Sequence, residues 1–189
     1  MKIPIKRMAV DAVLSAICVV LGYVSLEVGS DFKFTFENLP VIIGAMMFGP
    51  VDGMLIGLVG TFLYQLIRYG LEPSTVLWIV PYVLSGLFVG LVSRAFRYNM
   101  KIWQIIILML LNGLLVTGIN TACLYIYYKF ILLIPTETLL VKLPLKLGIS
   151  AIKAVAYSFL VPLLIMALKK AHIYEVPKAA VKEKESDHG

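Results

Sequence analysis

Four polar residues near the end of the chain recur at a spacing that could build a binding site. Separated by four, three and four residues, they are Lys146, Ser150, Lys153 and Tyr157. This spacing places all of them on one face of a helix. The lysines could hold an anionic ligand, because a charge inside an apolar segment is costly and usually functional. The alternative is that Lys146 extends to a membrane surface while Lys153 pairs with an acid such as Glu27 or Glu37.

A cation and three aromatic residues lie at the junction of two apolar runs. Tyr64 and Arg68 are four residues apart at the end of one run, and Trp78 and Tyr82 are four apart at the start of the next. Each pair therefore shares a helical face. A guanidinium can hold a carboxylate while an indole stacks on a flat heterocycle, so these residues are candidates for binding an acidic ring compound. An aromatic belt at a membrane surface is the alternative.

A loop after the first apolar run alternates aromatic and polar residues. Phe32, Phe34 and Phe36 are each separated by one residue, and Glu37 follows. A period of two predicts an extended segment, which could form a lid over a cavity that opens outward. Phe36 would then offer a ring, and Glu37 could accept hydrogen bonds from an amino-pyrimidine edge. The alternative is an interfacial segment that binds nothing.

Amide side chains mark one face of a later apolar run. Asn112, Val116 and Asn120 are spaced by four residues, and Thr117 lies beside them. Such amides can bind a ligand or form hydrogen bonds between membrane helices. Asn112 is a candidate for the binding site, although bridging between helices is the favoured role for each amide taken singly.

Motifs of the common catalytic sites are missing. The chain has no G-x-x-x-x-G-K-[ST], no H-E-x-x-H and no G-x-S-x-G, which are the signatures of nucleotide hydrolysis, zinc proteases and serine hydrolases. The histidines, His172 and His188, lie in the polar tail. Asp11 and Asp52 are expected near the cytoplasmic face and not paired across a buried site. We therefore expect a binding or transport protein rather than an enzyme, with no catalytic residue, metal site or cofactor.

The composition of the chain is typical of a protein embedded in a membrane. Hydrophobic residues make up 60% of the chain and charged residues 15%, against about 45–50% and about 25% in soluble domains. Soluble and disordered proteins are thereby excluded. The sequence predicts an all-α integral membrane protein with six transmembrane helices. Its apolar runs cover residues 8–28, 39–48, 54–67, 75–92, 102–133 and 146–168.

The second apolar run is too short for an ordinary span, since a membrane helix needs about 20 residues. It is expected to be tilted, partly interfacial or re-entrant. Residues 1–170 are expected to form one membrane-embedded binding domain, and the polar tail at 171–189 is expected to be disordered.

Positive charges predict the orientation. With both termini inside, the cytoplasmic side carries the larger share of the lysines and arginines. These are Lys2, Lys6, Arg7, Arg94, Arg97, Lys101, Lys169, Lys170, Lys178, Lys182 and Lys184. The outer side carries Lys33, Arg68, Lys129, Lys142 and Lys146. The net charge of +6 is thus explained by topology in the cell membrane, and no nucleic-acid partner is expected.

Small residues predict close helix contacts. Gly53 and Gly57 form one G-x-x-x-G pattern, and Gly86 and Gly90 form another. Such patterns let membrane helices approach closely, and packing within the chain is the expected use. The first run has a related pattern, Ala12-x-x-x-Ala16.

The chain resembles the substrate-binding S components of energy-coupling factor (ECF) vitamin transporters. The segment that carries the resemblance is Phe34-Thr-Phe-Glu-Asn-Leu-Pro-Val-Ile-Ile-Gly-Ala-Met-Met-Phe-Gly-Pro-Val-Asp-Gly53. In the family, an outer loop leads into a short second helix with an apolar-Pro start. A Phe-Gly-Pro-x-x-Gly turn then leads into the third helix. Ala12 and Ala16 match the small-residue motif of the family's first helix.

This resemblance implies a mechanism. The protein would capture one vitamin from outside and dock through Ala12 and Ala16 on a transmembrane coupling subunit. Two cytoplasmic ATPase subunits would drive that coupling subunit, and the vitamin would be released inside.

Folate is the substrate that the candidate residues favour, since Arg68, Lys146 and Lys153 suit carboxylates and Trp78 and Tyr82 suit a flat ring. The segment from residue 34 to 53 also resembles the folate group of the family, whereas the stretch at 69–78 departs from the Pro-Gly-Phe-Thr run of many folate members. Riboflavin and pantothenate are alternatives. Outside this family, the alternative functions are those of an autonomous channel or transporter and of a membrane enzyme or scaffold.

Overall fold

The computed structural model describes residues 5–24, 26–28, 32–72, 74–133 and 137–170. Its elements are α1 (Ile5–Tyr23), β1 (Leu26–Val28), β2 (Phe32–Phe34), α2 (Asn38–Phe48), α3 (Pro50–Tyr69), α4 (Thr75–Ala95), α5 (Ile102–Ile126), a π-helical turn (Tyr127–Leu132) and α6 (Glu137–Lys170). Each predicted apolar run therefore lies on an α-helix. The last helix begins earlier than predicted and includes Pro144. The tail expected to be disordered lies outside the described residues.

Apart from one short hairpin, the described residues form the helices expected of an all-α fold. The first helix ends at Tyr23 rather than continuing to Val28, and β1 pairs antiparallel with β2, with Glu27 opposite Lys33. Alternating aromatic residues suit an extended strand better than a helix, so the predicted extended loop is confirmed at Phe32–Phe34. The strand β2 contacts α6, which places this hairpin against the helix that carries the lysines.

Within the part of the chain that the structure describes, four helices are long and apolar enough to cross a membrane. They cover Pro50–Tyr69, Thr75–Ala95, Ile102–Phe130 and Lys146–Leu168. Large apolar side chains on their outer faces are exposed, for example Leu114 at 69% and Phe159 at 75%, as expected where lipid replaces water. The chain is therefore a multi-pass membrane protein. The exact count of six spans stays a prediction, because α1 carries several charges and α2 is short.

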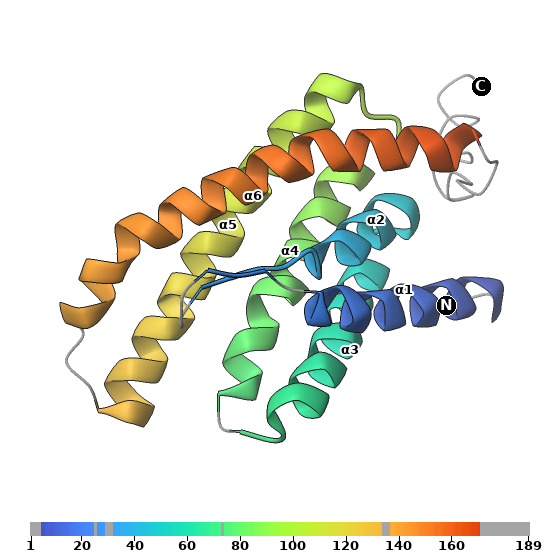
Figure 1. The fold of residues 1–189 in the computed structure, drawn as a ribbon. Coiled ribbons are helices and arrows are strands. Elements are labelled where there is room, and N and C mark those ends of the chain that lie inside the picture. The colour runs from blue at the N-terminus through green and yellow to red at the C-terminus, as the bar shows by residue number, and fades with distance from the viewer. Residues whose placement is uncertain (1–4, 25, 29–31, 73, 134–136, 171–189) are drawn as a thin grey trace.

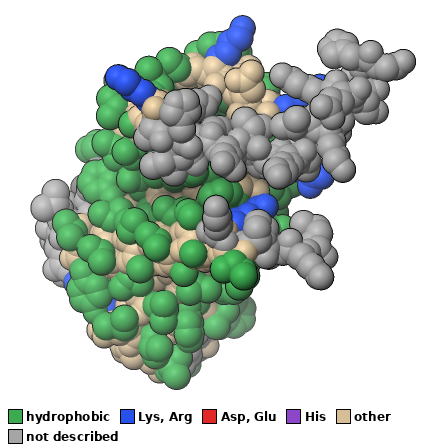
Figure 2. All heavy atoms as spheres, turned by 90° about the vertical axis from the view of Figure 1, so that its right-hand side faces the viewer, with side chains coloured by type: hydrophobic (Ala, Val, Ile, Leu, Met, Phe, Trp, Pro, Cys, Tyr) green, Lys and Arg blue, Asp and Glu red, His purple; other side chains and the backbone are tan. Residues whose placement is uncertain are grey.

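Connections gather at two ends of the bundle (Figure 1). The start of α1, the turn between α2 and α3, the turn between α4 and α5 and the end of α6 lie toward the right-hand side. The hairpin and the α5–α6 connection lie toward the left, and the α3–α4 connection lies at the bottom. Figure 2 views the first of these ends, where blue lysine and arginine side chains stand among green apolar ones. We call this end the basic end.

The short helix α2 is packed inside the bundle. Eight of its 11 residues are buried, and it contacts α1, α3, α4 and α6. Its Ile42 and Met46 belong to a core with Met109 of α5 and Val161 of α6. Eleven helical residues extend only about 16 Å, roughly half the thickness of a bilayer core. Because α2 ends at the basic end, its first residues lie deep within the molecule.

Glycines bring α3 and α4 together, as the G-x-x-x-G patterns predicted. A Cβ atom built on Gly86 would lie 2.4 Å from the carbonyl carbon of Gly53, and one on Gly57 would lie 2.9 Å from the carbonyl oxygen of Tyr82. Any larger residue would push the two helices apart. The contact within one chain is thus confirmed.

Candidate functional site

Polar groups from several helices converge on the start of α2. Glu37 and Asn38 open this helix, and their side chains are only 5% and 7% exposed. From α1, the Sγ of Cys18 donates a hydrogen bond of 3.0 Å to the carbonyl oxygen of Glu37. We call the residues around Glu37 and Asn38 the hub. It lies deep in the bundle because α2 is short.

A buried hydrogen-bond chain joins the hub to α4 and α5. The Nδ2 of Asn38 donates to the Oγ of Ser85 at 3.0 Å, and that hydroxyl donates to the Oδ1 of Asn112 at 3.0 Å. The bridging role expected for Asn112 is therefore confirmed. The Oδ1 of Asn38 is buried and has no hydrogen-bond partner among the residues that the structure describes. Leaving such an acceptor unsatisfied costs about 1–3 kcal/mol, so the hub can accept a hydrogen bond from a ligand.

The predicted face of α6 turns toward the hub. The hydroxyl of Tyr157 donates to the carbonyl oxygen of Thr35 at 3.3 Å, and its ring meets that of Phe36 edge to face at 6.1 Å. Lys153 is half-buried, and the carboxylate of Glu37 acts on it electrostatically. The acid near Lys153 is thus Glu37, while the side chain of Glu27 lies outside the described residues.

Lys146 differs from Lys153 in its surroundings. Among the described residues, its buried Nζ has no hydrogen-bond partner. The neighbouring groups that act on it electrostatically are Cys123 and Lys153, and neither is a carboxylate. The expectation that Lys146 extends to a membrane surface is wrong for this structure, because its ammonium is covered. A buried ammonium without a neighbouring carboxylate can bind an anionic group of a ligand.

Arg68 lies among three tyrosine rings. Its guanidinium carbon is 5.9 Å, 6.0 Å and 5.6 Å from the ring centres of Tyr23, Tyr64 and Tyr69. The pair of Tyr64 and Arg68 on one face was expected, but the ring of Tyr23 comes from α1 and could not be assigned from spacing. The Tyr64 ring also lies edge to face with Tyr23 and Tyr69, at 5.7 Å and 6.3 Å. The cation–π contacts hold this arginine between two helices.

The other aromatic candidates stand apart from the tyrosine cluster. Trp78 and Tyr82 are half-buried in the first half of α4. Within the described part of the chain, their rings make no contact with another aromatic ring. Both remain candidates for a flat ligand, since an aromatic face without a ring partner can stack on one.

The small residues of α1 face outward. Ala12 and Ala16 are exposed, and Val13 and Val20 beside them are 58% and 59% exposed. The opposite face packs on α3, where a Cβ on Gly60 would lie 2.7 Å from the Cβ of Cys18. The outward face is thus a smooth apolar strip that another helix could approach closely.

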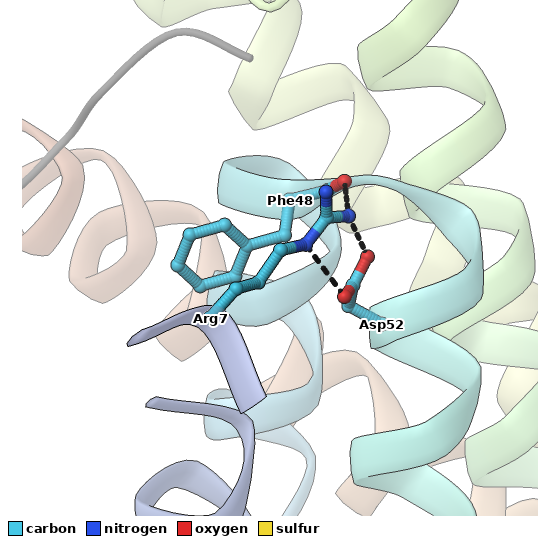
Figure 3. A network of polar contacts seen from close by, with 3 residues as sticks. All are labelled: Arg7, Phe48 and Asp52. Atoms are coloured by element: carbon cyan, nitrogen blue, oxygen red, sulfur yellow. Dashed lines mark hydrogen bonds and ion pairs between the residues drawn. The ribbon is translucent and has the colours of Figure 1, made fainter. Parts of the chain in front are cut away.

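At the basic end, the buried Asp52 is paired with Arg7, whose side chain is 27% exposed. Asp52 is itself 1% exposed, and Arg7 belongs to α1. Figure 3 shows the guanidinium of Arg7 between the carboxylate of Asp52 and the carbonyl oxygen of Phe48. Near this pair, Tyr98 closes the α4–α5 turn, and burial raises the pKa of its hydroxyl above the ordinary value. Spacing could not reveal the pair, because 45 residues separate its members.

Sequence reasoning also missed the contribution of Ser85 to the site. A lone serine at 0% exposure in an apolar run is itself a signal, since a polar group in a membrane helix must find a partner. The side chain of Asn38 was visible only as part of the resembling segment. Among the described residues, no group of three His, Cys, Asp or Glu side chains could hold a metal ion.

The chain is thus a helical membrane protein with hydrogen-bonding and cationic groups buried inside its bundle. A family model described as the ECF transporter, substrate-specific component, matches residues 6–175. The chain belongs to this family. It is therefore the substrate-binding subunit of an ECF transporter and not an enzyme. Membership implies a vitamin-type substrate and partnership with the transporter's transmembrane and ATPase module. No curated protein matches the chain significantly.

Proposed function

We propose that this subunit captures folate from outside the cell. The observation that carries the proposal is the hub, where the buried acceptor of Asn38 and the carboxylate of Glu37 lie together. The amino-pyrimidine edge of a pterin presents several N–H donors, and the two side chains offer acceptors for them. The resemblance of residues 34–53 to the folate group of the family supports the same substrate.

The rest of the vitamin would lie between aromatic and cationic groups. Phe36 adjoins the hub, and Tyr64, Trp78 and Tyr82 offer further ring faces for a flat heterocycle. The carboxylates would be held by Lys146 and Lys153 on α6 and by Arg68 at the end of α3. Because Lys146 has no acidic neighbour among the groups that act on it, it is the cation that gains most from an anionic ligand.

Docking on the coupling subunit would use the outward face of α1. Ala12 and Ala16 are exposed there, and small residues let a partner helix approach to backbone contact. The basic end would face the cytoplasm, in line with the positive residues seen in Figure 2 and with the charge rule for membrane loops. Both termini would then be cytoplasmic.

Fluorescence of the tryptophans tests the substrate. Trp103 is 57% exposed, whereas Trp78 is half-buried in the proposed site. Purified Trp103→Phe protein in detergent would be titrated with folate, riboflavin, pantothenate, thiamine and pyridoxine, with correction for inner-filter absorption. Saturable quenching by folate at a one-to-one ratio is the expected result.

Calorimetric titration with the same five vitamins would detect binding that does not change the fluorescence of Trp78. Saturable binding of riboflavin or pantothenate instead of folate would replace the proposed substrate while keeping the family role. The absence of binding across the panel by both methods would refute capture of any of these vitamins.

A further inference from the structure

The turn between α2 and α3 is held from three sides. Gly49 has a φ of +108°, and a Cβ on it would lie 2.6 Å from the hydroxyl oxygen of Tyr98. From α4, a Cβ on Gly90 would lie 2.4 Å from the Cα of Pro50. From α1, Arg7 reaches both arms of the turn. We call the group of Arg7, Asp52 and the Phe48 carbonyl the clasp.

The clasp matches the charges of the helix ends that meet there. Arg7 donates through Nη2 to the carbonyl oxygen of Phe48, the last residue of α2, and its guanidinium carbon lies 5.5 Å from the centre of the Phe48 ring. A cation is favoured at a helix C-terminus. Asp52 stands in the first turn of α3, where an anion is favoured. Arg7 donates through Nε to its Oδ1 at 2.8 Å and through Nη2 to its Oδ2.

The clasp completes the attachment of α1 at the end far from the hub. Toward the hub, α1 is held by close packing at two glycines. A Cβ on Gly22 would lie 2.7 Å from the Tyr64 ring, and one on Gly60 would lie 2.7 Å from the Cβ of Cys18. Toward the basic end, the side chains of Met8, Ala9 and Val10 are exposed. The bidentate ion pair is therefore the directional contact that sets the rotation of this part of α1 about its own axis.

We propose that the Arg7–Asp52 clasp positions α1 so that the strip around Ala12 and Ala16 faces the coupling subunit. The proposal rests on the docking role of α1 in the proposed function. Arg7 lies five residues, little more than one helical turn, before Ala12, so a rotation released at Arg7 is transmitted directly to the strip. The hub is near the other end of α1, and vitamin capture should not depend on the clasp. Arg7 and Asp52 would thus be positioning residues for assembly.

Assembly of the whole transporter tests the clasp. A tagged subunit would be co-expressed with its coupling and ATPase subunits, and the amount of coupling subunit that co-purifies would be measured per vitamin-binding subunit. The variant Arg7→Met/Asp52→Leu removes both charges of the ion pair together, so that neither partner is left without the other, and it keeps the neighbouring carboxylate of Asp11. Its vitamin affinity should match the wild type, while co-purification should fall about 5-fold or more, within the range usual for coupling between sites.

Two further variants make the result specific. The exchange Arg7→Asp/Asp52→Arg restores an ion pair and should recover part of the assembly. Arg94→Gln removes an exposed positive charge from the same end and should assemble as the wild type. Normal assembly of Arg7→Met/Asp52→Leu would overturn the clasp. Loss of its vitamin binding together with assembly would also overturn it, because the pair would then support the fold as a whole. A vitamin other than folate in the binding panel would leave the clasp untouched and change the proposed substrate alone.

Discussion

The two ends of α2 both bury charged or polar groups, but they satisfy them differently. At its C-terminal end, Asp52 and the Phe48 carbonyl both receive hydrogen bonds from Arg7. Near its N-terminal end, the Oδ1 of Asn38 is buried, and so is the Nζ of Lys146 on α6; neither atom has a hydrogen-bond partner in the described ranges. Closed pairing within the protein is typical of groups that fix structure. Incomplete pairing is expected where a ligand is to complete it.

This difference shows how one short helix can both fix the structure at one end and contribute to the binding site at the other. Its C-terminal end is locked to α1 and α3, so it provides a rigid base. Its N-terminal end stops deep in the bundle, where the hub residues are withheld from both water and lipid. Polar groups in such a place cost free energy unless they are bonded, and a captured vitamin would supply the missing bonds. The following changes should affect the two ends differently.

The largest effect is expected from Asp52→Ala. This change leaves the guanidinium of Arg7 without the carboxylate that binds it. Breaking a buried ion pair by removing one partner costs about 3–5 kcal/mol, and the lower end is expected here because Arg7 is 27% exposed. Thermal unfolding of the purified protein in detergent, without vitamin, would measure it. Arg94→Ala at the same end should change stability by no more than about 0.5 kcal/mol, and equal effects of the two variants would erase the contrast between closed and open pairing.

At the other end, Lys146→Met should weaken vitamin binding by about 1.5–3 kcal/mol without lowering stability. The ammonium has no bonding partner in the protein to lose, and methionine has a similar length. Calorimetric titration and thermal unfolding would be compared on one preparation. Unchanged affinity would remove Lys146 from the binding site.

Arg68→Ala and Lys153→Ala are expected to weaken binding by a similar amount, about 1.5–3 kcal/mol each, if they form charge-assisted bonds with the carboxylates. Unlike Lys146→Met, both should also lower stability, because Arg68 contacts three tyrosine rings and Lys153 interacts with Glu37. The same calorimetric titrations apply, and wild-type affinity in both variants would assign them structural roles.

Ser85→Ala should have a smaller effect, about 1–3 kcal/mol on stability. The change removes the acceptor of Asn38 and the donor to Asn112, so two buried amides lose a bond. Asn38 would then be free to turn, and affinity for the vitamin should fall as well. Ser158→Ala is a suitable control, because Ser158 donates only within its own helix to the Ala154 carbonyl. Full affinity of Ser85→Ala would show that the hydrogen-bond chain does not orient Asn38 for the ligand.

The smallest effect on the isolated protein is expected from Ala12→Trp and Ala16→Trp. Both residues face outward, so stability and vitamin binding should remain as in the wild type. Uptake by the assembled transporter should nevertheless be blocked, because a bulky ring prevents close helix approach. Transport of radiolabelled vitamin into cells would be the measurement, and undiminished uptake would place the docking surface elsewhere.

Local patterns predicted the parts of this molecule that depend on neighbours in the chain. The helices were predictable because apolar runs reflect the thickness of a bilayer. The face of α6 that carries Lys146, Lys153 and Tyr157 followed from the helical period alone. The contact of α3 with α4 followed from the glycine spacing of Gly53 and Gly86.

Contacts between distant residues were decided by tertiary structure. The contact of Arg68 with the ring of Tyr23 on α1 could not be predicted, because the spacing of residues within α3 does not show how that helix is rotated against α1. The same reason hid the ion pair of Arg7 with Asp52. A charge pattern shows that a group needs a partner but not which helix supplies it.

The amino-acid sequence by itself therefore determined the membrane as solvent, the helices and the stripes of residues that face inward. It also determined membership of the ECF substrate-specific family, which is carried by local motifs. Only the tertiary structure decided which buried groups are satisfied and which are left open. Hydropathy and helical period are properties of successive residues, whereas the pairing of buried charges depends on how separate helices are rotated and set in depth against one another.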